Sequence, residues 1–223
     1  MKKDTALLIF ARTSLEESRH KPFQKSKLFF EKQEARIFQM SFKLGIDLIR
    51  INEHDQVGNN FAERFCNAIQ NSFQKGYQKL ICIGNDTPHL QLKHLQSSLR
   101  QLQQGKASLG LNRNGGFYLL ALHKLQFDYN TFFKFTWNTS KVGKEVFQFI
   151  SKEKTVHLLP RFIDVNDASD FNRLRNSTFN LYKALRKLVF QYSTIVFQKV
   201  KEPLTYNSSL MVLSNKAPPY FQQ

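Results

Sequence analysis

The stretch Leu80-Ile-Cys-Ile-Gly-Asn-Asp-Thr-Pro88 decides the fold of this chain. Its first four residues form a short continuous apolar run, which is typical of a strand that is covered on both faces of a sheet. The polar turn from Gly84 to Pro88 ends the strand. Because ligands of open α/β sheets bind in the crevice beyond the carboxyl ends of the strands, Asp86 is the first candidate for a functional side chain.

Strands and helices alternate on either side of this stretch. The apolar runs Ala6 to Ala11 and Ile46 to Ile51 predict two more strands. Apolar residues at helical spacing predict helices over 28–44, 61–73 and 92–102, each with a glycine as a stop signal close behind. The charged segment Arg12 to Lys27 is predicted to be a loop. This alternation is the pattern of a mostly parallel sheet with helices on its faces.

The second half of the chain breaks this pattern. Strands predicted over 108–111 and 117–122 are joined by Asn112-Arg-Asn-Gly-Gly116, whose glycines permit a tight, open turn. Further along, the sequence predicts a helix over 141–150, a strand over 155–159, a helix that begins near Ala168 and a helical stripe within 171–202. An irregular tail follows, in which Leu210 to Leu213 could pair as an edge strand.

The composition fits one soluble domain with an excess of positive charge. The 223 residues are 41% apolar and 22% charged, and no apolar run approaches the roughly 18 residues that span a bilayer. Lys and Arg outnumber Asp and Glu by 33 to 17, which gives a net charge of +16 and favours anionic partners. Cys66 and Cys82 lie in apolar patterns and are predicted to be buried free thiols, and we expect a cytoplasmic location.

Two groups of polar residues follow predicted strands. Asp86 can hold a divalent cation against a diphosphate, since Mg²⁺ commonly takes one or two protein carboxylates and completes its shell with phosphate and water. Asp86 or Thr87 can equally cap a helix that opens at Pro88. One residue of the second group could complete the cation site, or the group caps the helix near Ala168; its members are Asp164, Asn166, Asp167 and Asp170.

Two further segments offer ligand contacts. Bare backbone at 112–116 would let a ligand approach, and Arg113 there could bind phosphate, although a plain hairpin turn explains the same residues. Trp137, the single tryptophan, can stack on a sugar or a base, or it can lie in the core. The sequence contains no P-loop, no GxGxxG fingerprint and no Ser-His-Asp spacing.

Several motifs, taken in order, resemble a known family. They are Ala6 to Arg12, Ala62 to Arg64, Ile83 to Pro88, Gly110 to Tyr118, Trp137 to Ser140 and Asp164 to Asp170. Together they resemble a bacterial family of uncharacterised glycosyltransferases of the GT-A type. The resemblance spans residues 5–175 and leaves the basic stretch beyond them uncovered.

The resemblance implies an α/β fold and a metal-dependent site. The fold would be the Rossmann-like, three-layer nucleotide-diphospho-sugar transferase fold, with a mostly parallel sheet and one antiparallel strand. Asp86 would help a Mg or Mn ion hold the diphosphate, and Asn166 would be a second ligand by similarity to related nucleotidyltransferases. The ion would neutralise charge on the departing nucleoside diphosphate. Arg12 and Lys21 would contact phosphate, and the same motifs supply the other substrate-binding candidates: Gly84, Arg113, Gly115, Gly116, Trp137 and Thr139.

Asn114 and Asp164 are the catalytic candidates, and the chain departs from the family at the first of them. The family's Asp-Gly-Gly appears here as Asn114-Gly-Gly116, and an amide accepts no proton at neutral pH. The first loop departs as well. Family members usually carry Pro-x-x-Gly and Lys-Thr-Arg there, whereas residues 12–21 contain no glycine and carry Glu16 and Glu17.

The expected function is that of a metal-dependent, glycosyltransferase-like enzyme that passes the sugar of a nucleotide-sugar to an unknown acceptor. The alternative is a catalytically impaired binding module of the same fold. A nucleotidyltransferase is less favoured, because those enzymes usually need a glycine-rich first loop.

The chain is expected to consist of a GT-A-like nucleotide-sugar-binding domain, residues 1–175, and a basic extension, residues 176–223. The extension would be a helix and an irregular tail packed on the same domain. Its charge suits an anionic membrane surface, whereas nucleic acid is not expected as a partner. A homodimer contact could also form at this end.

Overall fold

The computed structural model describes residues 4–152, 155–175 and 181–200. Within these ranges the strands join in one sheet with the order β2-β1-β3-β5-β4-β6. The strands are β1 (Thr5–Phe10), β2 (Asp47–Ile51), β3 (Lys79–Ile83), β4 (Ser108–Leu111), β5 (Phe117–His123) and β6 (His157–Leu158). β5 runs antiparallel to both of its neighbours, and the other pairs are parallel. The predicted mixed, mostly parallel sheet is therefore confirmed.

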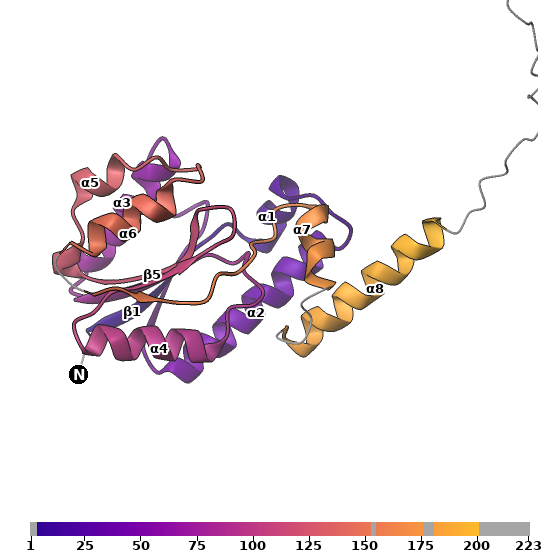
Figure 1. The fold of residues 1–223 in the computed structure, drawn as a ribbon, viewed down its shortest axis with the longest axis horizontal. Helices are drawn as coiled ribbons and strands as arrows, with labels where there is room; N and C mark the ends of the chain where they lie inside the picture. The colour runs from indigo at the N-terminus through magenta and orange to yellow at the C-terminus, as the bar shows by residue number, and fades with distance from the viewer. Residues whose placement is uncertain (1–3, 153–154, 176–180, 201–223) are drawn as a thin grey trace, which may run out of the picture.

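The central strands are apolar on both faces because helices cover both faces of the sheet. Side chains alternate along β1, so that Leu8 packs into one core and Leu7 into the other. The first core lies under α3 (Phe61–Gln74) and α6 (Val142–Ile150), and the second under α2 (Ser26–Leu44) and α4 (Leu92–Gln103). Figure 1 shows these helices as two layers with the sheet between them. The continuous apolar runs of the sequence are those of a doubly covered sheet.

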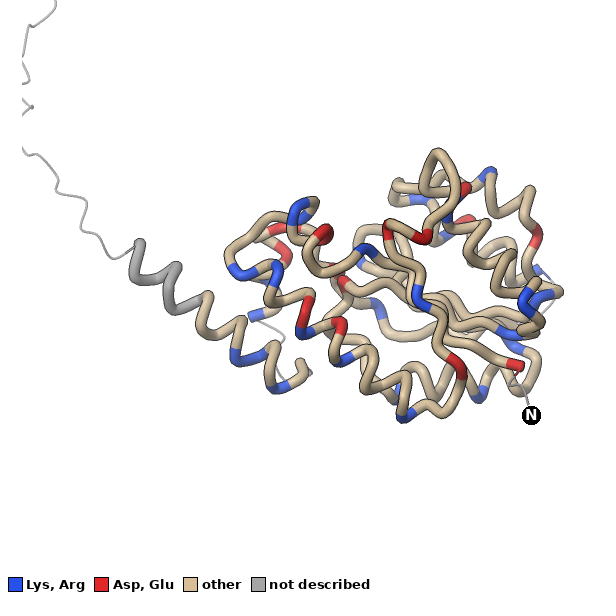
Figure 2. Tube along the Cα trace, turned by 180° about the vertical axis from the view of Figure 1, so that it is seen from behind, with Lys and Arg blue, Asp and Glu red and all other residues tan. Residues whose placement is uncertain are grey.

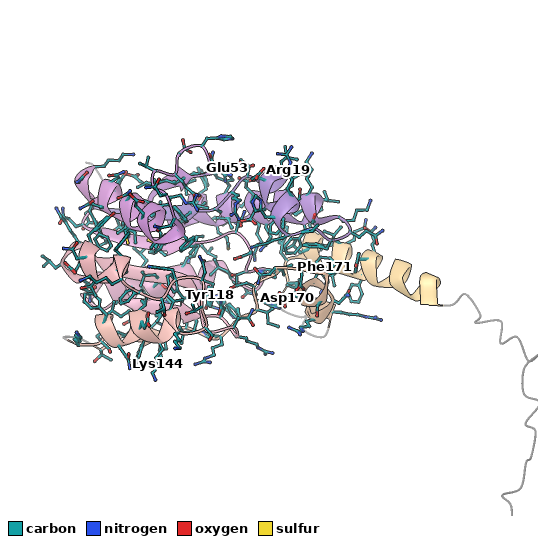
Figure 3. The ribbon with its side chains drawn as sticks, turned by 90° about the horizontal axis from the view of Figure 1, so that it is seen from above. Arg19, Glu53, Tyr118, Lys144, Asp170 and Phe171 are labelled. Carbon is teal, nitrogen blue, oxygen red and sulfur yellow. The ribbon has the colours of Figure 1, made fainter. Side chains whose placement is uncertain are left out.

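A third apolar cluster lies beyond the edge of the sheet. The amino-terminal part of α2 packs there against α7 (Ala168–Arg173) and α8 (Lys183–Val200). Phe171 of α7 stacks on Phe23 at 4.9 Å between ring centroids and meets Tyr192 of α8 edge to face at 4.9 Å. Figure 3 shows Asp170 and Phe171 beside the start of α8. From there α8 runs away from the sheet (Figure 1).

The segment Arg12 to Lys27 contains a helix, so the loop predicted there is wrong. Helix α1 (Ser14–His20) begins where Thr13 accepts a hydrogen bond from the backbone N–H of Glu16. Acidic Glu16 and Glu17 lie in its first turn and basic Arg19 and His20 in its last, which suits the helix dipole at both ends. This charge pattern favours a helix even though the segment has no apolar stripe.

Other boundaries differ in smaller ways. The strand predicted over 155–159 shrinks to β6. Two short elements without a clear sequence signal, the 3₁₀ turn Lys124–Gln126 and α5 (Tyr129–Phe133), separate β5 from α6. The edge strand predicted over 210–213 and the rest of the tail lie outside the described residues. In the described part of the chain, no helix combines the length and apolarity needed to cross a membrane.

Candidate functional site

A cavity of about 560 Å³ opens at the edge of the sheet where β1 and β3 end and β5 begins. This is the edge at which the topology of an α/β sheet places ligands. The cavity brings together ten of the twelve residues predicted for the site, namely Arg12, Lys21, Gly84, Asp86, Asn114, Gly116, Trp137, Thr139, Asp164 and Asn166. Residues separated by up to 154 positions in the sequence thus line one cavity.

The two other predicted residues, Arg113 and Gly115, are not among those that line the cavity. The backbone N–H of Arg113 donates to the carbonyl of Phe162 at 2.9 Å. Gly115 has a φ of +87°, and a Cβ atom there would lie 2.0 Å from the carbonyl oxygen of Ser140. Gly115 therefore lets the β4–β5 hairpin pack closely against the start of α6.

Asp86 belongs to a loop that caps no described helix. The helix after β3 begins at Leu92, in agreement with the stripe predicted over 92–102, and Gln91 is its N-cap. The alternative in which Asp86 or Thr87 caps a helix that opens at Pro88 is therefore wrong. Buried Arg36 of α2 donates to the carbonyls of Leu90, at 2.5 Å, and Thr87, at 3.3 Å, and so holds this loop from behind. The carboxylate of Asp86 is left on the cavity side.

Lys21 forms an ion pair with Asp86 at the cavity wall. Its Nζ lies 2.8 Å from Oδ2 of Asp86 and 3.6 Å from Oε2 of Glu17. Burial alone would lower the pKa of Lys21, but the charges of Asp86 and Glu17 outweigh it and the pKa is raised. Burial raises the pKa of Glu17, against the opposing effect of Lys21. Lys21 therefore stays protonated between two carboxyl groups.

Asp164 reaches the same place although β6 is not a neighbour of β3 in the sheet. After β6 the chain crosses the ends of β4 and β5, where Phe162 bridges to Asn112, and the backbone N–H of Val165 then donates to the carbonyl of Asp86 at 2.9 Å. Asp164 Oδ1 accepts from Thr87 Oγ1 at 2.6 Å. Its Oδ2 accepts from the side-chain amide of Asn112.

Asp164 is only 7% exposed, and burial raises its pKa to about 7, helped by the negative charge of Asp86 and opposed by its hydrogen bonds. The two carboxyl groups thus lie close enough for the charge of Asp86 to disfavour the charged form of Asp164.

The residues after Asp164 divide between capping and the cavity. Asp167 is the N-cap of α7 and accepts from the backbone N–H of Asp170 at 2.8 Å. Asp170 in turn accepts from the backbone N–H of Asn166 at 3.2 Å. Helix capping therefore accounts for Asp167 and Asp170, while Asp164 and Asn166 line the cavity.

Aromatic side chains form another wall of the cavity. The ring of Trp137 lies 5.4 Å from those of Phe61 and Phe65 and 6.0 Å from that of Phe117. Its indole N–H donates to the carbonyl of Phe132 at 2.8 Å, which fixes the ring plane. Trp137 therefore packs against the core and lines the cavity at once, while its stacking on a sugar or a base stays a prediction.

The cavity is also lined by polar residues that were not predicted for the site, among them Glu17, Arg64 and Asn112. Arg64 lies in the first turn of α3, and its Nε is buried without a hydrogen-bond partner in the described part of the chain. The same holds for Oδ1 of Asn112. A helix that follows a parallel strand begins at the ligand-binding edge, so the position of Arg64 carried a usable signal. For Glu17 the signal was its place in the first loop between the phosphate candidates Arg12 and Lys21, where it was counted only as a departure from the family.

In the described residues, no group of three or more His, Cys, Asp or Glu side chains could hold a metal ion. The acidic part of the cavity consists of Asp86, Asp164 and Glu17, and the basic part of Arg12, Lys21 and Arg64. Neither sign of charge therefore dominates the cavity wall.

The fold and the cavity at its carboxyl edge place this protein in the class with the nucleotide-diphospho-sugar transferase fold. The family described as "Uncharacterized protein conserved in bacteria (DUF2064)" matches residues 15–139, and the chain belongs to it. No curated protein matches the sequence.

Solved structures agree on the fold. A "putative nucleotide-diphospho-sugar transferase" from Desulfovibrio desulfuricans G20 is 20% identical, with 89% of this chain and 98% of that chain covered and a TM-score of 0.73. The Mycobacterium tuberculosis rv0371c homolog from Mycobacterium sp. strain JC1 is 11% identical, with 79% and 98% covered and a TM-score of 0.50. At these identities the likeness establishes the fold and nothing about the reaction.

Proposed function

We propose that the cavity binds a nucleotide-sugar and that the protein transfers the sugar to an acceptor. The observation that carries the proposal is the meeting of Asp86, Asp164 and Lys21 at the carboxyl edge of a sheet of nucleotide-diphospho-sugar transferase fold. The name of the structurally similar Desulfovibrio desulfuricans protein supports the same class of donor.

The basic side chains of the cavity are proposed to bind different parts of the donor. Arg12 and Lys21 are proposed to contact the diphosphate, because both line the cavity near the end of β1. Arg64 lies in the first turn of α3, with its Nε unpartnered. Its guanidinium supplies a further donor for phosphate or sugar oxygens. The aromatic wall around Trp137 suits stacking on a sugar ring or a base.

The residues present fit a divalent cation. Two carboxyl groups and one amide, from Asp86, Asp164 and Asn166, line the same cavity. Burial, together with the negative charge of Asp86, raises the pKa of Asp164, and a bound cation would favour its charged form. Mg²⁺ or Mn²⁺ needs few protein ligands when phosphate and water complete its shell. Asp86 and Asn166 would hold the ion, which would supply positive charge against the leaving diphosphate when bound.

The chain's own residues act on the sugar and the acceptor. Asp164 is proposed to accept the proton of the incoming acceptor hydroxyl, and hydrogen bonds from Thr87 and Asn112 hold its carboxylate in one orientation. Asn114 lines the cavity as an amide and is proposed to orient the sugar by hydrogen bonding, since it cannot take up a proton.

The test is the thermal stability of the full chain with a panel of nucleoside diphosphates and nucleotide-sugars, with and without Mg²⁺ or Mn²⁺. We expect at least one ligand to raise Tm when metal is present. The variant Asp86→Asn should lose this shift. Asp167→Asn is the matched control, because it removes a nearby carboxylate outside the cavity and keeps a good N-cap. No shift with any ligand would count against the proposal.

A binding module without transfer is the second candidate. It is favoured by the amide at Asn114 and by buried Glu17, which places a third carboxyl group where a diphosphate would lie. Under this reading a ligand raises Tm but no donor is turned over. Detection of sugar transfer or donor hydrolysis would exclude it. Release of pyrophosphate from a nucleoside triphosphate would instead indicate a nucleotidyltransferase.

A further inference from the structure

The outer face of α8 is basic and aromatic over its first ten residues. Leu185, Leu188 and Tyr192 are buried against α2 and α7. The opposite face exposes Lys183 and, one helical turn further on, Arg186 and Lys187. Tyr182 and Phe190, next to these cations, are 42% and 49% exposed. The exposure of two large aromatic rings beside these cations is unfavourable in water, so it points to a binding partner.

No carboxylate neutralises these cations in the described residues. The sequence carries no Asp or Glu between Asp170 and Glu202, and Figure 2 shows Lys and Arg but no acidic residue on the described part of α8. Acidic side chains on the helices packed against α8 have partners of their own. Glu31 pairs with Lys27 at 3.7 Å, Glu34 pairs with Arg50, and Asp170 pairs with Arg173 at 3.2 Å.

We propose that the outer face of α8, formed by Tyr182, Lys183, Arg186, Lys187 and Phe190, docks on an anionic lipid membrane. Cations attract acidic headgroups, while aromatic rings enter the interfacial region between headgroups and acyl chains. A convex helix face fits a flat bilayer. α8 also runs away from the sheet, so the body of the protein does not cover its outer face (Figure 1).

A nucleic acid is the competing anionic partner, and the geometry favours it less. The exposed cations form one short row on a single convex helix rather than a groove that follows a phosphate backbone. None of the residues that form this surface lines the cavity described above. Membrane docking therefore does not depend on nucleotide binding, and each can fail without the other.

The test measures binding of the full chain to vesicles without any nucleotide. We expect cosedimentation with vesicles of phosphatidylcholine and phosphatidylglycerol, none with phosphatidylcholine alone, and steep weakening with salt. The triple variant Lys183→Glu/Arg186→Glu/Lys187→Glu should bind at least about a hundredfold more weakly, since each surface cation contributes roughly a fivefold gain.

The matched control is Lys93→Glu/Lys124→Glu/Lys144→Glu. It changes the net charge equally, but its residues are exposed on other elements, and Figure 3 shows Lys144 far from α8. Both triple variants should melt near the wild-type temperature. A second variant, Phe190→Ser, should weaken binding to anionic vesicles without changing its salt dependence.

Equal loss in both triple variants would overturn the proposal, because it would show a response to net charge alone. So would failure of the wild-type chain to bind anionic vesicles. Tight binding to single-stranded or duplex RNA, abolished by the α8 variant while vesicles are ignored, would assign the surface to nucleic acid instead.

Discussion

The Nζ atom of Lys21 lies 2.8 Å from Oδ2 of Asp86, although 65 positions separate the two residues. The pair joins the end of α1 to the loop after β3 and closes one side of the cavity. Lys21 thus supplies a positive charge at the carboxylate that is proposed to hold a divalent ion. A bound diphosphate would share this ammonium with Asp86, so ligand binding and the stability of α1 should be coupled.

Replacing Lys21 by glutamine should destabilise the fold strongly. Asp86 and Glu17 would then lack their common cation, and breaking a buried ion pair costs about 3 kcal/mol. The double variant Lys21→Gln/Glu17→Gln should recover part of the loss, because one of the two stranded carboxyl groups is gone. Denaturant unfolding of the single and double variants measures this coupling. Simple additivity of the two single changes would contradict it.

The variant Glu17→Gln should change how stability depends on pH. Burial raises the pKa of Glu17 in the folded state, so the folded protein holds this proton more tightly than the unfolded chain. Its contribution to stability is therefore complete below the usual glutamate pKa and is lost as pH rises through the raised value. Denaturant unfolding at pH 5 and pH 8 should show a larger drop for the wild type than for the variant. An identical drop would show that Glu17 is not the cause.

Removing the side-chain amide of Asn112 should lower both the stability of the fold and the affinity for ligand, while the charged residues of the cavity stay in place. Asn112→Ala deletes the donor to Asp164 Oδ2, and a buried carboxylate that loses one hydrogen bond costs about 1–3 kcal/mol. Ligand binding should weaken in parallel, as Asp164 loses its fixed orientation. Asn114→Ala is the control, since this exposed residue makes no side-chain hydrogen bond within the described part of the chain and should shift stability by less than about 0.5 kcal/mol.

Gly115→Ala should be far more damaging than the same change at Gly45. Both glycines have positive φ, +87° and +70°, so an alanine pays the left-handed backbone cost of about 1–2 kcal/mol at either site. At Gly115 the new Cβ would also lie 2.0 Å from the carbonyl oxygen of Ser140, whereas nothing lies within 4 Å at Gly45. Thermal unfolding should show at least twice the loss at Gly115. Equal losses would mean that the hairpin can move away from α6.

Much of the fold could be predicted from the sequence because its signals are local. Continuous apolar runs marked β1 and β3, and apolar residues every three or four positions marked α2, α3 and α4. The position of Asp86 followed from its strand, since the end of a central strand faces the ligand edge. Cys66 and Cys82, predicted as buried free thiols, are confirmed as such.

The rest of the site depends on tertiary contacts that no local pattern carries. The link between Asp164 and Asp86 requires the segment after β6 to cross two strand ends, which the order of strands along the chain does not reveal. Glu17 was missed because α1 is held by capping and charge rather than by an apolar stripe. The sequence analysis chose Asn114 rather than Asn112 as a site residue. Only the structure shows that the side chain of Asn112 donates to Asp164.

The strand β6 contains two residues, and the chain that follows it carries Asp164 across to Asp86. A pairing this short opens more readily than the central strands do, and amide hydrogen exchange should find it among the fastest-exchanging parts of the sheet. Each opening would be expected to move the carboxyl group of Asp164 away from that of Asp86. We therefore expect mutations in this peripheral strand to lower the affinity for the proposed ligand without touching the cavity.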